Sequence, residues 1–256
     1  MSSRLYVIHI PRRFSADEWG GSETFIVEAG KRLLQQGHRT AVMTSKALNR
    51  QASDHYGSLE IRRYSYLYPY LGLSAEARQQ LDKKAGNLFS FSLLFALLAM
   101  KKPDILHLHT GKRLGGIARF AARMRGIPYV ITLHGGKLAV PVQEQESWVE
   151  PTKGAFEWGR VLGLLVGSRR VLDDAAAIIC VGRDEYEAVT ARYPGKPVHY
   201  LPNGVDTGRF SQGDGTAFRR KYGIPEQRFL VLTSARLDRQ KNQLEMIRQL
   251  GAHADL

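Results

Sequence analysis

Short apolar segments alternate with helix-like segments through most of this 256-residue chain. Residues 5–10 are almost entirely apolar, as is typical of a strand buried on both faces. Residues 22–36 carry an apolar stripe at helical spacing, with Ser22 as a candidate N-cap and Gly37 as the stop. Residues 40–44 form the next predicted strand. This opening stretch therefore predicts a parallel β-α-β unit.

The same alternation continues downstream. Further strands are predicted at residues 59–66, 104–108, 128–133, 177–181 and 198–201. Helices are predicted at residues 74–100 (broken near Gly86), 114–125, 155–173 and 184–193. Repeated units of this kind predict an α/β fold, a Rossmann-like doubly wound parallel sheet with helices on both faces.

Turn-forming residues change the character of the chain after residue 201, beginning with Pro202, Asn203 and Gly204. We predict one complete domain over residues 1–202. Residues 203–256 would be a hinge and the first βα unit of an incomplete second Rossmann-like domain. That unit would contain a helix at 217–222, a strand at 229–233 and a helix at 242–250.

Positive charge is concentrated in the first half of the chain. The net charge is +13, and residues 1–140 account for +12 of it. Such a balance favours a polyanionic partner, namely nucleic acid, anionic lipid or an anionic substrate, although solubility alone would also explain it. The tyrosines at alternate positions from 64 to 70 fit no nucleic-acid motif, so no nucleic-acid partner is expected. A single cysteine, Cys180, excludes a disulfide scaffold and a Cys-rich zinc site.

The most apolar stretch covers residues 88–100 and has lysine pairs on both sides. It is shorter than the roughly 20 residues of a membrane-spanning helix. Two interpretations stay open, a buried core helix and a helix lying on an anionic membrane surface.

Glycines precede the first predicted helix, in the sequence Gly20-Gly21-Ser22-Glu23. Ligands of open α/β sheets bind beyond the carboxyl ends of the strands, and a helix N-terminus there attracts phosphate. A diphosphate could therefore bind at Gly20 and Gly21, although a flexible connection with an N-cap gives the same pattern. The loop matches neither the dinucleotide fingerprint nor a P-loop.

Histidines end two of the predicted strands. His107 and His109 are two residues apart, so their side chains share one face of a strand. They could ligate zinc, or simply pack beneath the loops. His134 and Gly135 follow the strand at 128–133, where a histidine could donate a hydrogen bond to a sugar hydroxyl or a leaving group.

Cations surround the start of the last predicted helix, including Arg236 and Lys241. An arginine fork and a lysine point charge suit a departing diphosphate, although either side chain could simply be solvated.

Taken in order, these motifs resemble those of the family 4 retaining glycosyltransferases. The resemblance rests on the Gly20-Gly21-Ser22-Glu23 loop, the strand ending in His107-Leu108-His109, and His134-Gly135. It continues with Pro202-Asn203-Gly204-Val205-Asp206 and with Arg236 and Lys241, and so covers essentially the whole chain.

The resemblance implies a GT-B architecture of two Rossmann-like domains that face each other across a cleft. It implies that the first domain, residues 1–202, mainly binds the acceptor and that the second, beginning at residue 203, mainly binds the nucleotide sugar. It implies a nucleotide-sugar donor, a glycan or lipid-linked acceptor, retention of anomeric configuration and no metal or other cofactor. His134, Arg236 and Lys241 would be catalytic, with both cations neutralising the leaving diphosphate. The matching positions for donor or acceptor binding are Gly20, Gly21, Glu23, His109, Gly135 and Asn203. The expected location is cytoplasmic, at the membrane's inner face.

The sequence departs from the family's pattern after Arg236. The family's second domain runs on for well over a hundred residues and carries a pair of glutamates that contacts the sugar and the ribose, and this pair is not found between Arg236 and Leu256. We therefore expect a truncated enzyme that binds donor poorly by itself. The alternative is a non-catalytic domain of the same fold that another chain completes.

Overall fold

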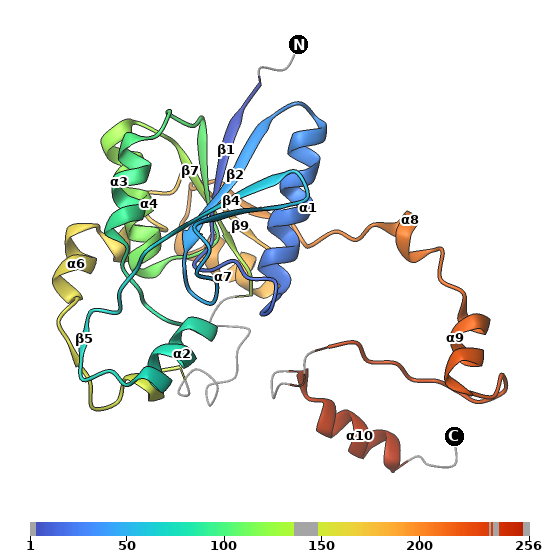
Figure 1. Cartoon of the computed structure of the whole chain (residues 1–256). Helices are drawn as coiled ribbons and strands as arrows, with labels where there is room; N and C mark the ends of the chain where they lie inside the picture. The colour runs from blue at the N-terminus through green and yellow to red at the C-terminus, as the bar shows by residue number, and fades with distance from the viewer. Residues whose placement is uncertain (1–3, 136–147, 236, 238–240, 253–256) are drawn as a thin grey trace. The chain divides into compact units, whose positions relative to one another are not determined.

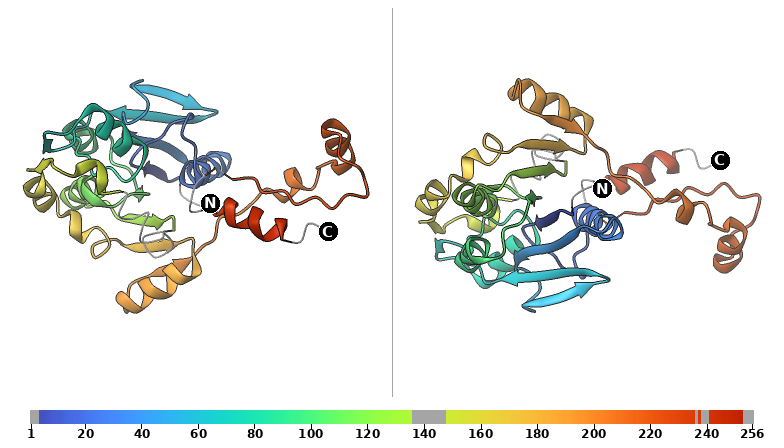
Figure 2. Two further views of the ribbon diagram at one scale, coloured as in Figure 1. Left: turned by 90° about the horizontal axis from the view of Figure 1, so that it is seen from below. Right: turned by 90° about the horizontal axis from the view of Figure 1, so that it is seen from above.

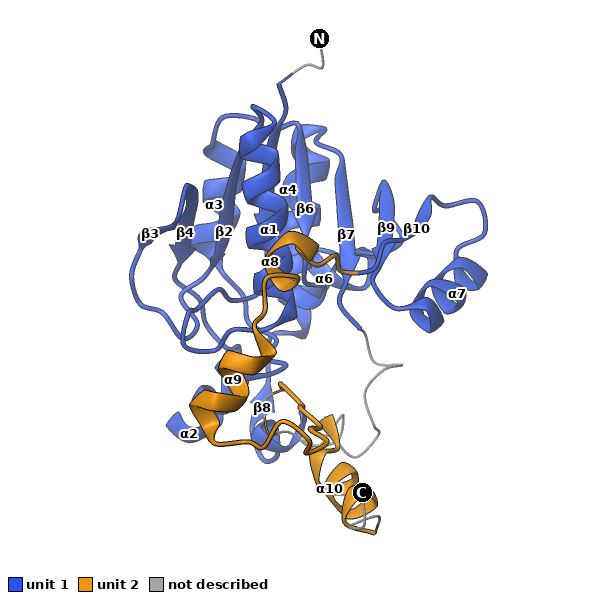
Figure 3. Cartoon of the chain, turned by 90° about the vertical axis from the view of Figure 1, so that its right-hand side faces the viewer, with its two compact units in different colours: residues 1–202 blue, residues 203–256 orange. Residues whose placement is uncertain are grey.

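The computed structural model describes residues 4–135, 148–235, 237 and 241–252 (Figure 1). The chain divides into two compact units, Met1–Pro202 and Asn203–Leu256 (Figure 3). The division falls where the turn-rich sequence begins. The acceptor-side and donor-side roles that we expect for the two units remain predictions.

The first unit is built on one large sheet with the strand order β10-β9-β7-β6-β1-β2-β4-β3. Its strands are β1 (Tyr6–Ile10), β2 (Arg39–Ser45), β3 (Ser53–Tyr56), β4 (Leu59–Tyr64), β6 (Ile105–Leu108), β7 (Tyr129–Leu133), β9 (Ala177–Cys180) and β10 (Val198–Tyr200). Every neighbouring pair is parallel except β3 and β4. The predicted doubly wound α/β fold is confirmed.

Helices cover both faces of this sheet. The helices of the first unit are α1 (Gly21–Gln35), α2 (Ala75–Lys83), α3 (Phe91–Ala99), α4 (Lys112–Arg125), α6 (Arg160–Leu165) and α7 (Arg183–Arg192). Of these, α1, α3, α4 and α7 pack on the strands. Helix α1 lies on one side of the sheet, and α3 and α4 lie on the other (Figure 2). The core is divided in the same way, with Ile26 packed near Val42 and Ile61 in one cluster. Ile8 and Leu93 belong to the other cluster.

The break predicted within residues 74–100 is confirmed, because α2 ends at Lys83 and α3 begins at Phe91. The hydroxyls of Ser74 and Ser90 accept hydrogen bonds from backbone N–H groups in the first turn of each helix, at 3.1 Å in both cases. Helix α3 buries Leu93 and Leu97 in the core, as the first interpretation of this stretch predicts. No helix among the described residues is long and apolar enough to cross a membrane.

The predicted helix at residues 155–173 is wrong. Its place is taken by β8 (Phe156–Glu157), which pairs with β5 (Tyr70–Leu71), by the short helix α6 and by a 3-10 turn at Ser168–Arg170. Gly167 has a φ of 62°, a left-handed conformation that a continuous helix cannot contain. The Arg119 guanidinium occupies the space that a side chain at this position would need.

A short hairpin that the sequence pattern did not predict closes one edge of the sheet. Strand β3 is followed by a turn at Gly57, whose φ is 59°, and pairs antiparallel with β4. Its sequence, Ser-Asp-His-Tyr, is polar, and Asp54 forms an ion pair of 2.9 Å with the buried Arg63. This ion pair fixes the outermost strand to its neighbour.

The second unit contains α8 (Thr207–Phe210), α9 (Gly215–Tyr222) and α10 (Gln243–Gly251). The carboxylates of Asp206 and Asp214 cap the first two. The predicted strand at 229–233 is wrong, because these residues adopt no regular structure. A strand needs a hydrogen-bonded neighbour, and no described residue of this unit provides one. None of the described residues of this unit is buried.

Candidate active site

The strand order reverses direction between β1 and β6. The chain passes from β1 to β2 on one side, and from β6 to β7 on the other. Ligands of doubly wound sheets bind at such a switch point, beyond the carboxyl ends of the strands. Arg12 and Thr110 lie two residues beyond the ends of β1 and β6, and therefore at the expected ligand edge.

Arg12 joins the loop after β1 to the end of α2. Its Nη1 donates to the carbonyl oxygens of Leu81 and Asp82, at 3.1 and 3.0 Å, and Nη2 donates to that of Lys83 at 3.3 Å. Carbonyls in the last turn of a helix lack helical partners, so a cation is favourable there. The Ser45 hydroxyl donates to the carbonyl of Arg12 at 2.6 Å, which fixes the loop from the sheet side.

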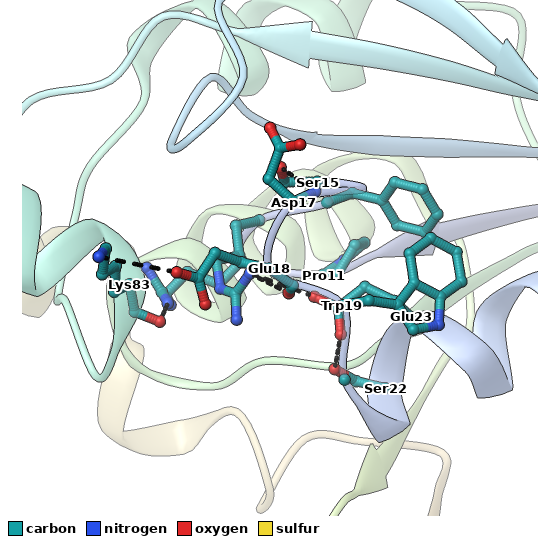
Figure 4. Close-up of polar contacts among 12 residues, drawn as sticks. Pro11, Ser15, Asp17, Glu18, Trp19, Ser22, Glu23 and Lys83 are labelled. Carbon is teal, nitrogen blue, oxygen red and sulfur yellow. Dashed lines mark hydrogen bonds and ion pairs between the residues drawn. The ribbon is translucent and has the colours of Figure 1, made fainter. Parts of the chain in front are cut away.

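The buried carboxylate of Glu23 forms polar contacts within the glycine loop and with the segment before it. It is 3% exposed, its Oε1 lies 3.7 Å from Arg13 Nη1, and the Ser22 hydroxyl donates to Oε2 at 2.9 Å (Figure 4). A Cβ at Gly20 would lie 3.1 Å from Glu23 Oε2, whereas one at Gly21 would meet no atom within 4 Å. The glycine at position 20 thus makes room for the buried carboxylate. Contact of either glycine with a ligand remains a prediction.

Four histidines meet beneath α1. His9 of β1 and His107 of β6 are direct register partners, and His109 and His134 follow the ends of β6 and β7. The Phe25 ring of α1 packs on three of them, with ring centroids 5.4 Å from His134, 5.6 Å from His109 and 6.0 Å from His107. The strands alternate, so Ile8 and Leu106 face the other core.

Hydrogen bonds connect the rings. His9 Nδ1 lies 3.0 Å from His109 Nε2, and His109 Nδ1 lies 3.0 Å from His134 Nε2. His107 Nε2 lies 2.7 Å from the Thr132 hydroxyl. The structure therefore brings His109 and His134 together, and adds His9, which the sequence pattern did not single out.

Burial keeps these imidazoles neutral. Desolvation lowers the pKa of His9 and of His134 to about 4. The same effect, with repulsion from neighbouring histidines, lowers the pKa of His107 and of His109 well below its ordinary value. Neutral imidazole is the form that ligates metals. Among the described residues, His9, His107 and His109 are the group whose ligand atoms, all within 4.8 Å of one another, could hold a metal ion.

A pocket of about 240 Å³ opens at the switch point. Its lining residues are Arg12, Lys84, Ala85, Gly86, Thr110, Gly111, Lys112 and Trp148. Three of these side chains are cationic, and the N-terminus of the 14-residue helix α4 contributes Gly111 and Lys112. The Lys112 ammonium donates to the carbonyl of Ala85 at 2.6 Å. Cations beside a helix N-terminus suit a phosphate or diphosphate.

The remaining predicted residues are distributed over both units. Gly135 follows His134 with a φ of 74°, a conformation that favours glycine. Asn203 and Lys241 are exposed residues of the second unit, and Arg236 lies outside the described residues. Of the residues missed from sequence, Arg12 lies two residues beyond the end of an apolar strand, which is a usable signal. His9 gives a weaker one, a lone polar residue within that strand.

Comparison with known proteins identifies relatives among bacterial glycosyltransferases. A putative teichuronic acid biosynthesis glycosyltransferase of Bacillus subtilis is 27% identical over 146 residues, 56% of this chain and 33% of the relative. The UDP-Gal:alpha-D-GlcNAc-diphosphoundecaprenol alpha-1,3-galactosyltransferase of Escherichia coli is 28% identical over 156 residues, 59% of this chain and 36% of the relative. D-inositol 3-phosphate glycosyltransferase 2 of Catenulispora acidiphila is 28% identical over 228 residues, 85% of this chain and 49% of the relative. The chain thus spans between a third and a half of the length of these relatives.

Among solved structures, the calicheamicin glycosyltransferase CalG4 aligns with a TM-score of 0.44 at 13% identity, over 79% of this chain and 53% of that one. The sequence model of Glycosyltransferase Family 4 matches residues 19–209, which is most of the chain and includes the glycine loop, the strand-end histidines and the segment after Pro202. The chain therefore belongs to Glycosyltransferase Family 4.

Proposed function

We propose that this chain is part of a retaining glycosyltransferase. It would transfer a sugar from a nucleotide-sugar donor to a phosphate-bearing glycan or lipid-linked acceptor, without a metal, in cell-surface polysaccharide or glycolipid synthesis. The observation that carries the proposal is the cationic pocket at the switch point, because Thr110 in its wall directly follows His109, which is hydrogen-bonded to His134.

The relatives support a phosphorylated acceptor. The name of the Escherichia coli enzyme specifies a diphosphoundecaprenol acceptor, and that of the Catenulispora acidiphila enzyme an inositol phosphate. In the pocket, Arg12, Lys84 and Lys112 supply the positive charge that such a group requires. We place the acceptor phosphate there, with His134 contacting the donor sugar.

Replacing both pocket lysines, Lys84→Ala with Lys112→Ala, is expected to weaken binding of a short-chain prenyl diphosphate-linked sugar by at least tenfold. A charge-assisted hydrogen bond contributes about 1.5–3 kcal/mol, so the loss of even one has this effect. Isothermal titration measures it. The matched control is Lys31→Ala with Lys153→Ala, two exposed lysines outside this pocket.

Two results would contradict this placement. One is an equal loss of affinity in the control pair, which would show that the loss follows from the lower net charge of the chain and not from the pocket. The other is equal binding of a phosphate-free analogue by the unchanged chain. A chain that binds acceptor but supports no transfer when joined to a complete donor domain would favour the alternative, a non-catalytic binding domain.

The donor half of the site is proposed to need residues beyond this chain. Supporting this, no described residue of the second unit is buried, and Phe210, Phe229 and Leu232 are each at least 70% exposed. Arg236 and Lys241 would neutralise the leaving diphosphate only in the completed domain. Residues 1–256 alone are therefore expected to give no titration heat with nucleotide sugars at micromolar concentration, and micromolar binding would refute this part.

Association with an anionic membrane surface is proposed for the same chain, at the cytoplasmic face. Phe91 and Phe95 lie one helical turn apart on α3 and are 45% and 65% exposed, and Lys101 and Lys102 are exposed just beyond it. An apolar face with basic neighbours suits a lipid interface.

The double change Phe91→Ser with Phe95→Ser is expected to reduce co-sedimentation with phosphatidylglycerol vesicles several-fold, because it removes the apolar contact. Tyr200→Ser, at an exposed position of β10, serves as the control. Equal binding of the unchanged chain to neutral and anionic vesicles would show that the negative charge of the lipid does not contribute to binding.

A further inference from the structure

Three imidazoles form a continuous hydrogen-bonded row from the interior of β1 to the end of β7. His109 stands in the middle and uses both ring nitrogens, Nε2 towards His9 Nδ1 and Nδ1 towards His134 Nε2, each at 3.0 Å. The two terminal atoms, His9 Nε2 and His134 Nδ1, are buried and have no hydrogen-bond partner among the described residues.

Proton counting leaves two arrangements of this row. A neutral imidazole carries one N–H donor and one acceptor nitrogen. If His109 carries its proton on Nε2, all three rings are protonated on Nε2, and the Nε2–H of His9 has no acceptor among the described residues. If His109 carries its proton on Nδ1, all three rings are protonated on Nδ1, and the Nδ1–H of His134 has no acceptor among these residues. The state of one ring thus sets the state of all three.

The surroundings of the two ends distinguish these arrangements. His9 is fully buried, between the sheet and α1, where no ligand can reach it. His134 is only partly buried and follows β7 at the ligand edge of the sheet. Each arrangement leaves one buried N–H without a partner in the described part of the chain, and such groups are rare in proteins. The cost is greater at His9, whose whole side chain is buried, than at His134, whose side chain is partly exposed at the ligand edge, so the arrangement with the orphan N–H at His9 is disfavoured.

We infer that His9 and His109 are positioning residues that hold His134 as its Nδ1–H tautomer, so that Nδ1 offers a hydrogen-bond donor to an oxygen of the bound ligand. The identity of that oxygen, on a sugar or a phosphate, rests on the proposed function. The tautomer itself belongs to this chain and exists without a ligand.

A fixed tautomer matters because His134 is neutral. A charged imidazolium donates from both nitrogens, whereas a neutral ring donates from one, and a wrong tautomer would present a lone pair to the ligand's oxygen. His109 prevents this by donating from its Nδ1–H into His134 Nε2. In the same way, His9 holds His109 by donating from its own Nδ1–H.

The test is a two-bond 1H–15N correlation spectrum of the ligand-free chain with 15N-labelled histidine, at a pH where the buried rings are neutral. We expect His134 with a protonated Nδ1 and an unprotonated Nε2, and the same pattern for His109 and His9. In His109→Leu, at least half of the His134 population should change to the Nε2–H tautomer. In His109→Asn the amide N–H replaces the Nδ1 donor, so the original tautomer should be retained.

The matched control is His107→Leu, from the same cluster but hydrogen-bonded to Thr132 outside the row. It should leave the His134 tautomer unchanged. The inference is overturned if His134 in the unchanged chain is Nε2-protonated, or if His109→Leu leaves its tautomer as it was. It is also overturned if the purified chain carries stoichiometric zinc by elemental analysis, with metal-shifted nitrogens at His9 and His109. If His109→Leu does not fold, the spectrum of the unchanged chain still decides, and a failure of the proposed function would not alter that spectrum.

Discussion

Acidification from pH 6.5 to pH 4 is expected to destabilise the first unit by several kcal/mol. The pKa of His9 and that of His134 fall from 6.5 to about 4 in the folded state, so the unfolded chain binds protons first as the pH decreases. The stabilisation is fully present above pH 6.5 and is lost progressively down to about pH 4. Each shift corresponds to roughly 3 kcal/mol, against a typical domain stability of about 5–15 kcal/mol.

Urea unfolding followed by circular dichroism across this pH range measures the effect. His9→Leu should reduce the pH dependence, because it removes one buried titrating ring without leaving a large cavity. His199→Gln, at an exposed histidine, should retain all of it. An unfolding free energy that is constant from pH 6.5 to pH 4 in the unchanged chain would show that the histidines are not buried as neutral groups.

Replacing Arg113 is expected to lower stability by about 3 kcal/mol, the usual cost of removing one partner of a buried ion pair. Its side chain is 3% exposed and is paired with Glu157. It also donates to the carbonyl oxygens of Gly159, at 3.0 Å, and Asn87, at 2.8 Å. Arg113→Met leaves these three acceptors without their donor, so β8 and the start of α6 lose their attachment to α4.

Thermal unfolding should show a melting temperature lower by about 6–12 °C for a unit of this size. Arg123→Met is the matched control on the same helix. Arg123 also pairs with a carboxylate, that of Asp174 at 3.1 Å, but its side chain is 59% exposed, so its loss should cost less than about 1 kcal/mol. Similar melting temperatures for the two variants would show that the Arg113 contacts do not hold this segment in place.

Much of the parallel sheet was predictable from sequence because its signals are local. The apolar strand at residues 5–10 and the stop at Gly37 each act within a few residues of the chain. The hairpin of β3 was not predictable in this way, because Asp54 is fixed by Arg63, a contact that hydrophobic periodicity does not encode. The error at residues 155–173 has a similar cause, since the Arg119 side chain meets the chain at Gly167 only in the folded state.

The candidate site shows the same division. His109 and His134 were found because strand ends in a doubly wound sheet converge at one edge. His9 was not, because its pairing with His107 depends on the register between strands that lie about a hundred residues apart. The Arg12 contacts with the end of α2 likewise depend on tertiary packing. The roles of Asn203, Arg236 and Lys241 depend on a domain partner and stay predictions.

The hairpin edge also has a consequence outside the molecule. An outermost strand exposes unpaired N–H and C=O groups that can recruit a strand from another chain, and short, polar edge strands reduce this risk. Strand β3 has four residues, one of them a charged aspartate tied inward to Arg63. It therefore makes a poor template for intermolecular β-pairing, which protects a large sheet from growing into aggregates at this margin.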